Sequence, residues 1–253
     1  MDYAHLVPPL HYPPSAIRHP LPMRLLALDT STEACSVALL IDSELRMRFQ
    51  LTERSHAELV LPMVESLLEQ EGLALADLDG LAFGRGPGAF TGLRIASGVV
   101  QGLALGANLP VAPVSSLAAV AEQLTVSPGE AVLVCNDARM GEVYWGVYRR
   151  EPNGSMATLC SETVSAPDRV GEGAPGARHA AGNALQRYPG LAERLDAAGL
   201  QLHADIYPRA DAIARLGALA LAAGHGVAAE LALPVYVRDD VARPAGTPVT
   251  GLS

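Results

Sequence analysis

The feature that most constrains the fold is a pattern that occurs once in each half of the chain. Residues 24–29 have the composition of a buried strand ending on Asp29, and a polar turn and a return strand at 35–41 follow. Residues 131–137 repeat the strand, with Asp137 in the place of Asp29, before a polar turn and a strand at 143–148. An internal duplication of this kind predicts two similar lobes with a cleft between them.

The remaining elements follow from apolar periodicity and turn residues. The first half continues with a strand at 44–51, a helix at 54–71, a strand at 80–84 and a helix at 91–107. The second half adds a strand at 176–182, a short helix at 184–188 and a longer helix at 209–223. These elements predict an α/β chain with an N-terminal lobe at 23–125, a C-terminal lobe at 126–230 and a C-terminal tail at 231–253.

Residues 1–22 do not have the composition of a folded segment. They contain six prolines, show no apolar periodicity, and lack the basic start and apolar core of a secretory signal. We expect a disordered N-terminal extension, with Met23 as an alternative biological start. Elsewhere, polar residues or prolines interrupt every apolar run before it reaches the roughly 18 residues of a membrane span. Three cysteines without metal-site spacing indicate reduced thiols, so we expect a cytoplasmic protein with no membrane contact.

Charge limits the partners of the chain. With 18 Lys and Arg against 27 Asp and Glu, the net charge is −9. An autonomous nucleic-acid binder carries a basic face that neutralises phosphates. We therefore expect any contact with RNA to be supplied by another protein.

A glycine-rich run lies between a predicted strand and a predicted helix. It extends from Gly84 to Ile95 and includes Gly86, Gly88 and Gly92. Glycines at such a junction permit positive φ and close backbone approach, and the helix start offers free N–H groups to an anion. A tight turn with no ligand explains the run equally well. No acidic residue follows at dinucleotide-site spacing, and there is no Lys-Ser or Lys-Thr pair of a Walker loop.

Three separated motifs together resemble the TsaB (YeaZ) family, a component of the bacterial machinery that makes threonylcarbamoyladenosine on tRNA. They are the sequence at 28–32, the glycine run up to Arg94, and residues 137–144, with a further match at 234–238. The likeness extends from Met23 to about Ala242. It implies the actin-like ATPase fold (ASKHA, ribonuclease H-like) with two similar lobes, in agreement with the duplication.

The resemblance also implies partners and a division of labour. The paralogue TsaD binds a metal through an HxxxH element, and the positions that look equivalent here are Ser116 and Val120. The hydroxyl of Ser116 is a poor ligand for a transition metal, and the side chain of Val120 has no ligating atom. We therefore expect no metal site and no tightly bound cofactor, with ATP used by the complex through its partner subunits. The implied role is a non-catalytic subunit that binds and activates TsaD, together with TsaE, and that meets tRNA only through the complex.

In active members of this superfamily, an aspartate at the end of the first strand positions magnesium and a polar turn holds phosphate. Asp29, Thr30 and Ser31, with Gly86 and Gly88, are therefore candidates for a vestigial phosphate site. Alternatively, Asp29 caps its own turn by accepting backbone N–H groups. Residues 180–184 lack the doubled glycine that would support an adenine ring in relatives, which argues against strong ATP use by this chain.

Two predicted helices carry broad apolar faces. Gly98, Gly102 and Gly106 recur every four residues, bordered by Ile95, Val99 and Leu105. Each helical glycine costs roughly 1 kcal/mol relative to alanine, so the stripe indicates close packing, either within the lobe or against a partner. The preceding helix offers Leu59, Met63 and Leu67, with Pro62 expected to kink it or to mark its effective start. The resemblance implies that this surface binds TsaD or supports a homodimer.

Two other functions remain open at this stage. A metallopeptidase-like glycoprotease would need a metal pair or an activated nucleophile, and the histidines show no HExxH spacing. We assign His56, next to Ser55, to a helix start or to the surface because no GxSxG nucleophile elbow occurs. An independent small-molecule kinase of the actin-like superfamily would turn over ATP without TsaD.

Overall fold

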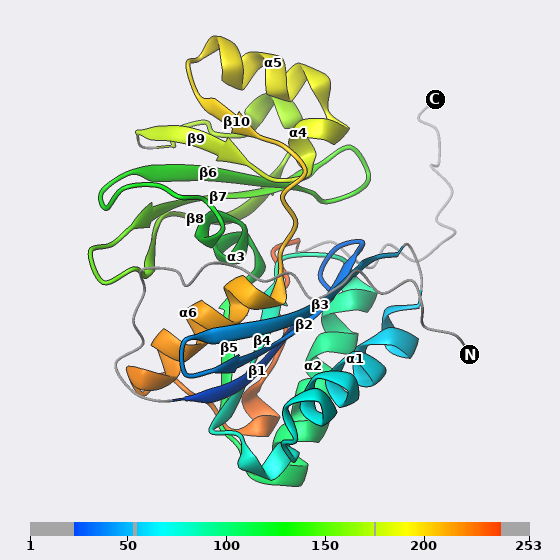
Figure 1. The fold of residues 1–253 in the computed structure, drawn as a ribbon. Helices are drawn as coiled ribbons and strands as arrows, with labels where there is room; N and C mark the ends of the chain where they lie inside the picture. Colours follow the sequence, from blue (N-terminus) through cyan, green and yellow to red (C-terminus); the bar gives the residue numbers. More distant parts are fainter. Residues whose placement is uncertain (1–22, 53–54, 175, 239–253) are drawn as a thin grey trace, which may run out of the picture.

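Two five-stranded sheets, one above the other in Figure 1, form the framework of the protein. The computed structural model describes residues 23–52, 55–174 and 176–238. The first sheet has the order β3-β2-β1-β4-β5, with strands Arg24–Asp29 (β1), Ala34–Ile41 (β2), Glu44–Leu51 (β3), Gly80–Gly86 (β4) and Val111–Ser115 (β5). The second has the order β10-β9-β6-β7-β8, with strands Ala131–Asp137 (β6), Val143–Arg150 (β7), Met156–Ser165 (β8), Ala177–Ala181 (β9) and Gln201–His203 (β10).

The two sheets have the same topology. The order of the second matches that of the first when β6 is placed on β1, β7 on β2 and β9 on β4. In both, the central strand pairs antiparallel with the next strand of its hairpin and parallel with the strand on its other side. The predicted duplication into two similar lobes is confirmed, and the chain has the α/β actin-like ATPase fold.

Burial explains why the central strands are continuously apolar. On β1, Leu26 and Leu28 lie in one hydrophobic cluster, and Leu25 and Ala27 lie in another on the opposite face of the sheet. Successive side chains of a strand point to opposite faces, so a strand covered on both sides needs apolar residues at every position.

The helices that cover the sheets are exchanged between the two halves of the chain. On the first sheet, α1 (His56–Glu71) and α2 (Phe90–Ala107) cover one face and α6 (Ala210–Ala222) covers the other, as Figure 1 shows. On the second sheet, α4 (Ala184–Arg187) and α5 (Pro189–Ala197) lie on one face and α3 (Ser116–Glu122) on the other. Each sheet therefore has one face covered by a helix from the other half of the sequence, α6 on the first sheet and α3 on the second.

This exchange corrects the predicted lobe boundaries. Helix α6 falls within the expected C-terminal lobe 126–230, yet it packs on β1 and β4 of the first sheet. At Gly217, a Cβ atom would lie 2.6 Å from the Cβ of Ala82, so only glycine allows this close approach of helix and sheet. The expected tail from 231 onward also returns to the first lobe, where Ala232 is fully buried. Residues 1–22 and 239–253 lie outside the described residues.

Most predicted elements are present, but several were missed. The expected helices at 91–107 and 209–223 correspond to α2 and α6, and the strand expected at 80–84 continues to Gly86. The prediction of an effective helix start or kink at Pro62 is wrong about the start, because α1 begins at His56 and continues past the proline. The missed strands and α-helices of the described residues are β5, α3, β8, α5 and β10.

Candidate functional site: the cleft between the lobes

A cleft of about 780 Å³ lies where the central strands of both sheets end. Its walls come from the turn after β1, the first turns of α1 and α2, the turn after β6, and the C-terminal segment at 235–238. Several side chains of the cleft carry charge, among them Glu33, Glu58, Arg139 and Arg238. The sequence duplication predicted a cleft between the lobes, and the structure places it there.

The carboxylate of Asp29 is sealed by its own lobe rather than directed into the cleft. Its side chain has no exposed surface. Its Oδ1 accepts hydrogen bonds from the backbone N–H of Ser31 at 2.9 Å and the Ser31 hydroxyl at 2.7 Å. Its Oδ2 accepts one from the Ser116 hydroxyl at 3.0 Å. Burial raises the pKa of Asp29, and these three hydrogen bonds oppose that rise. The capping interpretation of Asp29 is therefore the one that the structure supports.

The glycine-rich run packs directly on the turn that follows β1. The hydroxyl of Thr30 donates to the carbonyl oxygen of Gly92 at 2.7 Å, and the N–H of Ala89 donates to the carbonyl oxygen of Ser31, also at 2.7 Å. Side chains at Gly88 and Gly92 would overlap the backbone of Ser31 and Thr30 respectively.

Two further glycines of this run have distinct structural roles. Gly84 has no space for a Cβ because the Asp29 carboxylate occupies it, and Gly86 has a φ of +103°. The glycines thus serve close backbone packing, as one of the two interpretations of this run predicted. Of the vestigial phosphate residues, Thr30, Ser31 and Gly88 line the cleft, whereas Asp29 and Gly86 are not among the residues that line it.

Asp29 and Asp137 both end the central strand of their sheet, as predicted, but their side chains face opposite sides. Asp29 is on the same face of β1 as Leu25 and Ala27, under α6. Asp137 shares its face with Leu133 and Cys135, under the outer helices, and its Oδ1 accepts a hydrogen bond from Tyr188 at 2.8 Å.

The residue of the second lobe on the inner face is Asn136, which is 2% exposed. Its side-chain oxygen and nitrogen make no hydrogen bond within the described part of the chain. The sequence alignment of the two halves therefore gives the correct strand position but not the equivalent side-chain direction. No pattern in the sequence marks this buried amide.

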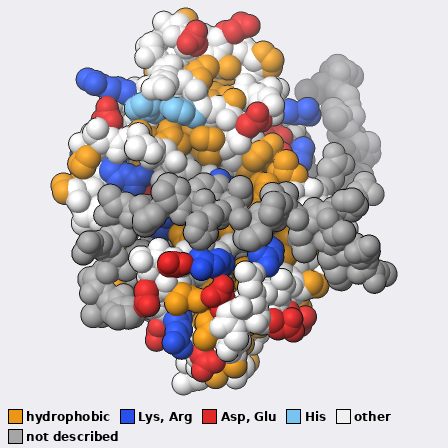
Figure 2. Space-filling view, in the orientation of Figure 1, with side chains coloured by type: hydrophobic (Ala, Val, Ile, Leu, Met, Phe, Trp, Pro, Cys, Tyr) orange, Lys and Arg blue, Asp and Glu red, His pale blue; other side chains and the backbone are white. Residues whose placement is uncertain are grey.

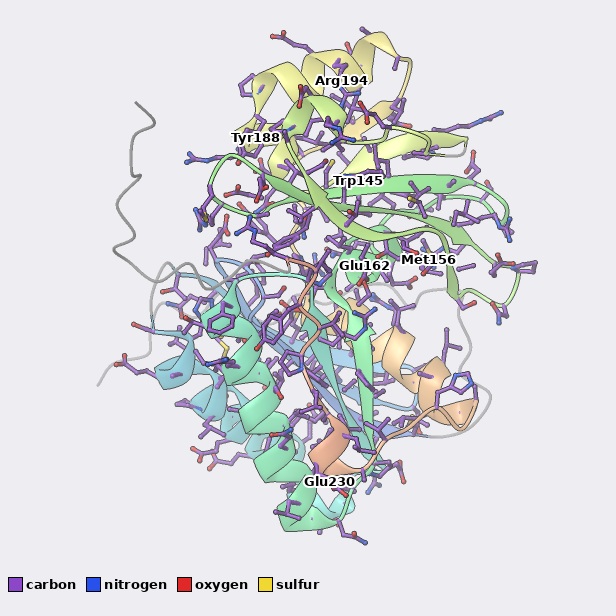
Figure 3. All side chains as sticks on the ribbon, turned by 180° about the vertical axis from the view of Figure 1, so that it is seen from behind. Trp145, Met156, Glu162, Tyr188, Arg194 and Glu230 are labelled. Atoms are coloured by element: carbon purple, nitrogen blue, oxygen red, sulfur yellow. The ribbon has the colours of Figure 1, made fainter. Side chains whose placement is uncertain are left out.

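An ion pair between Arg85 of the first sheet and Glu162 of the second joins the two lobes. Glu162 on β8 lies between the lobes in Figure 3. It accepts from Arg85 of β4 at 3.0 Å and from the Tyr148 hydroxyl at 3.0 Å. Burial, followed by the charge of Glu162, raises the pKa of Tyr148 well above its ordinary value, so the hydroxyl keeps its proton.

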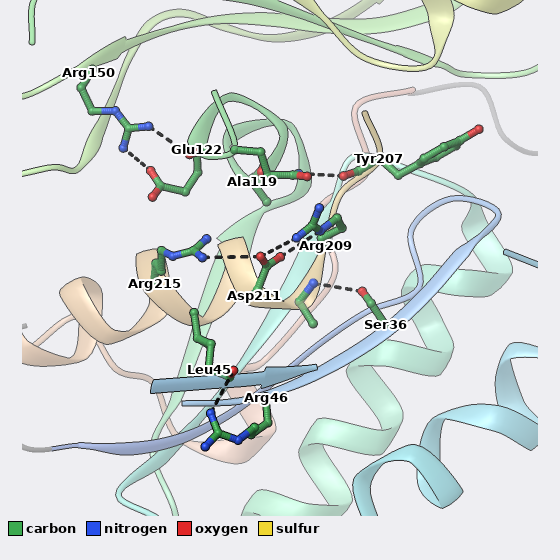
Figure 4. A network of polar contacts seen from close by, with 12 residues as sticks. Ser36, Leu45, Arg46, Ala119, Glu122, Arg150, Tyr207, Arg209, Asp211 and Arg215 are labelled. Atoms are coloured by element: carbon green, nitrogen blue, oxygen red, sulfur yellow. Dashed lines mark hydrogen bonds and ion pairs between the residues drawn. The ribbon is translucent and has the colours of Figure 1, made fainter. Parts of the chain in front are cut away.

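A second polar cluster connects the two halves of the chain through α3. The Arg150 guanidinium pairs with the Glu122 carboxylate and also donates to the carbonyl oxygens of Glu122 and Leu124, at 3.0 and 3.1 Å. Both side chains are buried, and burial raises the pKa of Glu122 while Arg150 opposes the rise. Figure 4 shows this pair beside the contacts that Asp211 makes with Arg209 and Arg215.

The C-terminal segment at 232–238 forms one wall of the cleft and bridges the lobes. On the first lobe, the N–H of Val235 donates to the carbonyl oxygen of Arg85 at 2.7 Å, and the ring of Tyr236 lies 5.3 Å from that of Phe90. On the second lobe, Arg238 pairs with Glu142. The motif at 234–238 falls within the predicted tail, but its tertiary contacts place it in the wall of the cleft.

Comparisons with known proteins agree with this architecture. Residues 50–242 match the family model described as TsaD, tRNA N6-adenosine threonylcarbamoyltransferase. The Escherichia coli protein named tRNA threonylcarbamoyladenosine biosynthesis protein TsaB is 42% identical over 226 residues, which cover 87% of this chain and 96% of that protein. The chain belongs to the TsaB family. A solved structure described as YeaZ from Pseudomonas aeruginosa superposes with a TM-score of 0.75 at 46% identity, covering 85% of this chain and 99% of that one.

In this TsaB-family chain, helix α2 carries an open glycine stripe on its outer surface. Gly98, Gly102 and Gly106 are exposed, and no atom lies within 4 Å of where their Cβ atoms would be. Leu105 is 76% exposed, whereas Ile95 and Val99 are partly buried against the core of the lobe. The interpretation that the glycine stripe packs within the lobe is therefore wrong, because the stripe faces away from it.

The predicted interface residues on α1 need correction. Met63 and Leu67 are 3% and 0% exposed and belong to the first hydrophobic core, and Leu59 is partly buried against that core. Their prediction as a partner surface is wrong, because the sequence cannot tell which side of an apolar helix faces the sheet. The exposed large apolar residue of α1 is Leu61, at 43%.

Ser116, Val120 and His56 each have a structural role in this member of the TsaB family. Ser116 and Val120 lie on α3, where Ser116 is committed to Asp29 and Val120 is fully buried. His56 begins α1, as expected, and borders the cleft. Burial lowers the pKa of His56, opposed by contacts with Thr32 and Glu33. None of the helices in the described residues has the length and apolar character needed to cross a membrane.

Proposed function

We propose that this chain is a non-catalytic subunit that binds and activates TsaD and that acts, together with TsaE, in threonylcarbamoyl transfer to the tRNA adenosine beside the anticodon. Its relatives are named for tRNA threonylcarbamoyladenosine biosynthesis, and a family model described as TsaD matches most of its length. These comparisons support a role in that pathway. The structure supplies the argument for a scaffold within it.

The observation that carries the proposal is the open glycine stripe on α2. Three glycines within one helix disfavour that helix by roughly 1 kcal/mol each relative to alanine. Within the described residues no neighbouring atom approaches the positions of their Cβ atoms, so packing inside this chain does not explain them. A helix of another protein can approach such a stripe closely, and Leu105 supplies exposed apolar surface beside it. We assign this face, defined by Gly98, Gly102, Gly106 and Leu105, to TsaD.

The sealed aspartate favours a scaffold over an independent kinase. A kinase of this superfamily would use Asp29 to position magnesium, but both carboxylate oxygens of Asp29 accept hydrogen bonds from residues of its own chain. One of the donors to Asp29 is Ser116, which stands at one of the two positions that resemble the metal ligands of TsaD. ATP is then used through the partner subunits, and no tightly bound cofactor is required here. The glycoprotease alternative gains no support from this arrangement.

The net charge of −9 supports indirect contact with tRNA, because phosphate binding by this chain alone would require a basic face. The α2 face would also serve a homodimer in the absence of TsaD. The two uses compete for the same surface, so TsaD is expected to displace self-association.

The test is reconstitution of tRNA modification with the cognate TsaD and TsaE, using Gly102→Leu against Gly190→Leu. Gly190 is a fair control because it is also helical, exposed and free of neighbours within 4 Å, but lies on α5 of the other lobe. Omission of the chain should abolish modification. Gly102→Leu should remain folded, lose binding to TsaD and fail to support modification, whereas Gly190→Leu should behave as the wild type.

Two results would contradict the proposal at different points. Full modification by TsaD and TsaE alone would remove the activating role. Unchanged TsaD affinity of folded Gly102→Leu would keep the role but exclude this face as the interface. Sedimentation of the same variants without TsaD reports whether the face supports a homodimer.

A further inference from the structure

Two histidines from different strands meet on the second lobe, and neither of them lines the cleft. His179 is in β9 and His203 is in the three-residue edge strand β10. The two strands are parallel, with Gln201 opposite His179 and His203 opposite Ala181. Because side chains alternate between faces, both histidines project from the same face of the sheet. Figure 2 shows histidine side chains gathered on the surface of this lobe.

The separation of the two ring nitrogens matches that of two ligands of one metal ion. Nδ1 of His179 and Nε2 of His203 are 3.2 Å apart, with ring centroids 5.4 Å apart and planes inclined by 40°. Two imidazole nitrogens bonded to one ion at about 2.0–2.1 Å, with an angle of about 90–110° between the bonds, are separated by about 2.9–3.4 Å. The observed separation lies within this range. We propose that His179 and His203 form a two-ligand site for a divalent transition metal of the zinc and copper class.

A hydrogen bond between the two rings, which the same distance permits, does not conflict with this proposal. In the absence of metal, the N–H of one neutral ring donates to the lone pair of the other. To bind the metal, the donor ring takes its other tautomer, with the proton on its second ring nitrogen, so that both facing nitrogens offer a lone pair and both rings stay neutral. Burial and the neighbouring His179 lower the pKa of His203, which favours the neutral form. Imidazole is a ligand suited to zinc, copper and nickel ions.

The remaining coordination positions belong to water. In the described part of the chain, no three His, Cys, Asp or Glu side chains gather closely enough to hold a metal together. Glu130, which precedes β6, interacts electrostatically with His179, so the surroundings of the pair include a negative charge. Two protein ligands with water predict binding much weaker than that of a closed structural zinc site.

The expected consequence is local stabilisation of the sheet edge. Strand β10 has three residues and pairs only with β9 in the described sheet. A metal held by one histidine from each strand joins them through side chains in addition to the backbone ladder. A ligand that binds the folded state but not the unfolded state raises the unfolding temperature according to its concentration and affinity.

The test is titration of the full chain, without a purification tag, with Zn²⁺ followed by calorimetry and with Cu²⁺ followed by electron paramagnetic resonance. His5, His11 and His19, which lie outside the described residues, are first replaced by glutamine to remove competing ligands. His179→Gln and His203→Gln are then compared in this background with His225→Gln, an exposed histidine that follows α6. Circular dichroism checks that each variant is folded.

The expected result is one saturable site that is weakened about tenfold or more by either His179→Gln or His203→Gln and unchanged by His225→Gln. The Cu²⁺ spectrum should show coupling to two imidazole nitrogens in the parent and to one in each single variant. Three results would overturn the two-ligand site and leave the pair as a hydrogen bond. They are an absence of saturable metal binding, metal binding that neither substitution weakens, and metal binding that only one of the two substitutions weakens.

Discussion

Replacing glycine by alanine at two positions of helix α2 should change stability in opposite directions. Gly92 is in the first turn of the helix, where a Cβ would overlap the carbonyl oxygen of Thr30 and lie 3.0 Å from its carbonyl carbon. Gly98 is in the same helix, exposed, with no atom within 4 Å of a Cβ. The same substitution in one helix therefore adds a methyl group at a site without space for it, Gly92, and at a site with space for it, Gly98.

The magnitudes follow from these two environments. Alanine at Gly98 should stabilise the protein by about 0.8–1.0 kcal/mol, the difference in helix propensity. At Gly92 the clash is with backbone, which cannot rotate away as a side chain can. Overpacking costs about 1–3 kcal/mol. Displacement of the Thr30 hydroxyl from the Gly92 carbonyl oxygen adds about 1 kcal/mol. After a small gain in propensity, Gly92→Ala should destabilise the protein by about 1–3 kcal/mol, so the two variants differ by at least about 2 kcal/mol.

Urea unfolding followed by far-ultraviolet circular dichroism measures both changes, provided that the slope of the transition is unchanged. Gly92→Ala with stability equal to or above the wild type would refute the close packing of the turn after β1 on the glycine-rich run. Destabilisation by Gly98→Ala would show that the stripe is covered within the free chain. If the stripe binds TsaD, Gly98→Ala should raise stability and weaken TsaD binding together, which separates an interface glycine from a structural one.

Other predictions test burial and charge. The lowered pKa of His56 means that the folded state binds fewer protons than the unfolded state near pH 6, so the free energy of unfolding falls from pH 7 to pH 5. In urea titrations, the free energy of unfolding of His56→Gln should fall less over that range than that of the wild type. An equal fall in both proteins would exclude His56 as the cause. Burial raises the pKa of Cys35 and Cys135 to about 12, whereas Cys160 is only partly buried. Native protein should therefore react with a thiol reagent at one site, removed by Cys160→Ser, and three fast-reacting thiols would be inconsistent with this burial. Arg150→Met should destabilise the protein by about 3–5 kcal/mol, because it removes the arginine that pairs with the buried carboxylate of Glu122. A loss of stability below about 1 kcal/mol would contradict a buried ion pair. Deletion of residues 1–22, which lie outside the described residues, should leave the unfolding temperature and TsaD binding unchanged, and a large loss of either would show that the extension takes part.

The order of elements could be predicted because it depends on local patterns. The apolar runs at 24–29 and 131–137, the turns that follow them and the periodicity at 91–107 are properties of adjacent residues, and they match β1, β6 and α2. The duplication was visible for the same reason. The missed elements include β5, which continues directly into α3, and β10, with only three residues. Such short segments carry little periodicity, and their partners lie far away in the sequence.

Direction and partnership were decided by tertiary structure. The sequence showed that α1 is apolar, but only packing determined that Met63 and Leu67 face the sheet while the glycines of α2 face outward. The assignment of α6 to the first lobe likewise depends on contacts between residues far apart in the chain.

At the cleft and at the histidine pair, the sequence determined which chemical groups are available. It showed Asp29 at a strand end and histidines without helical spacing. The fold brought Ser116 to the Asp29 carboxylate and joined His179 to His203 across two strands. Local sequence specifies the conformation of a segment because that conformation depends mainly on neighbouring residues. Which faces meet depends on burying apolar surface across the whole chain, and only the folded structure settles that.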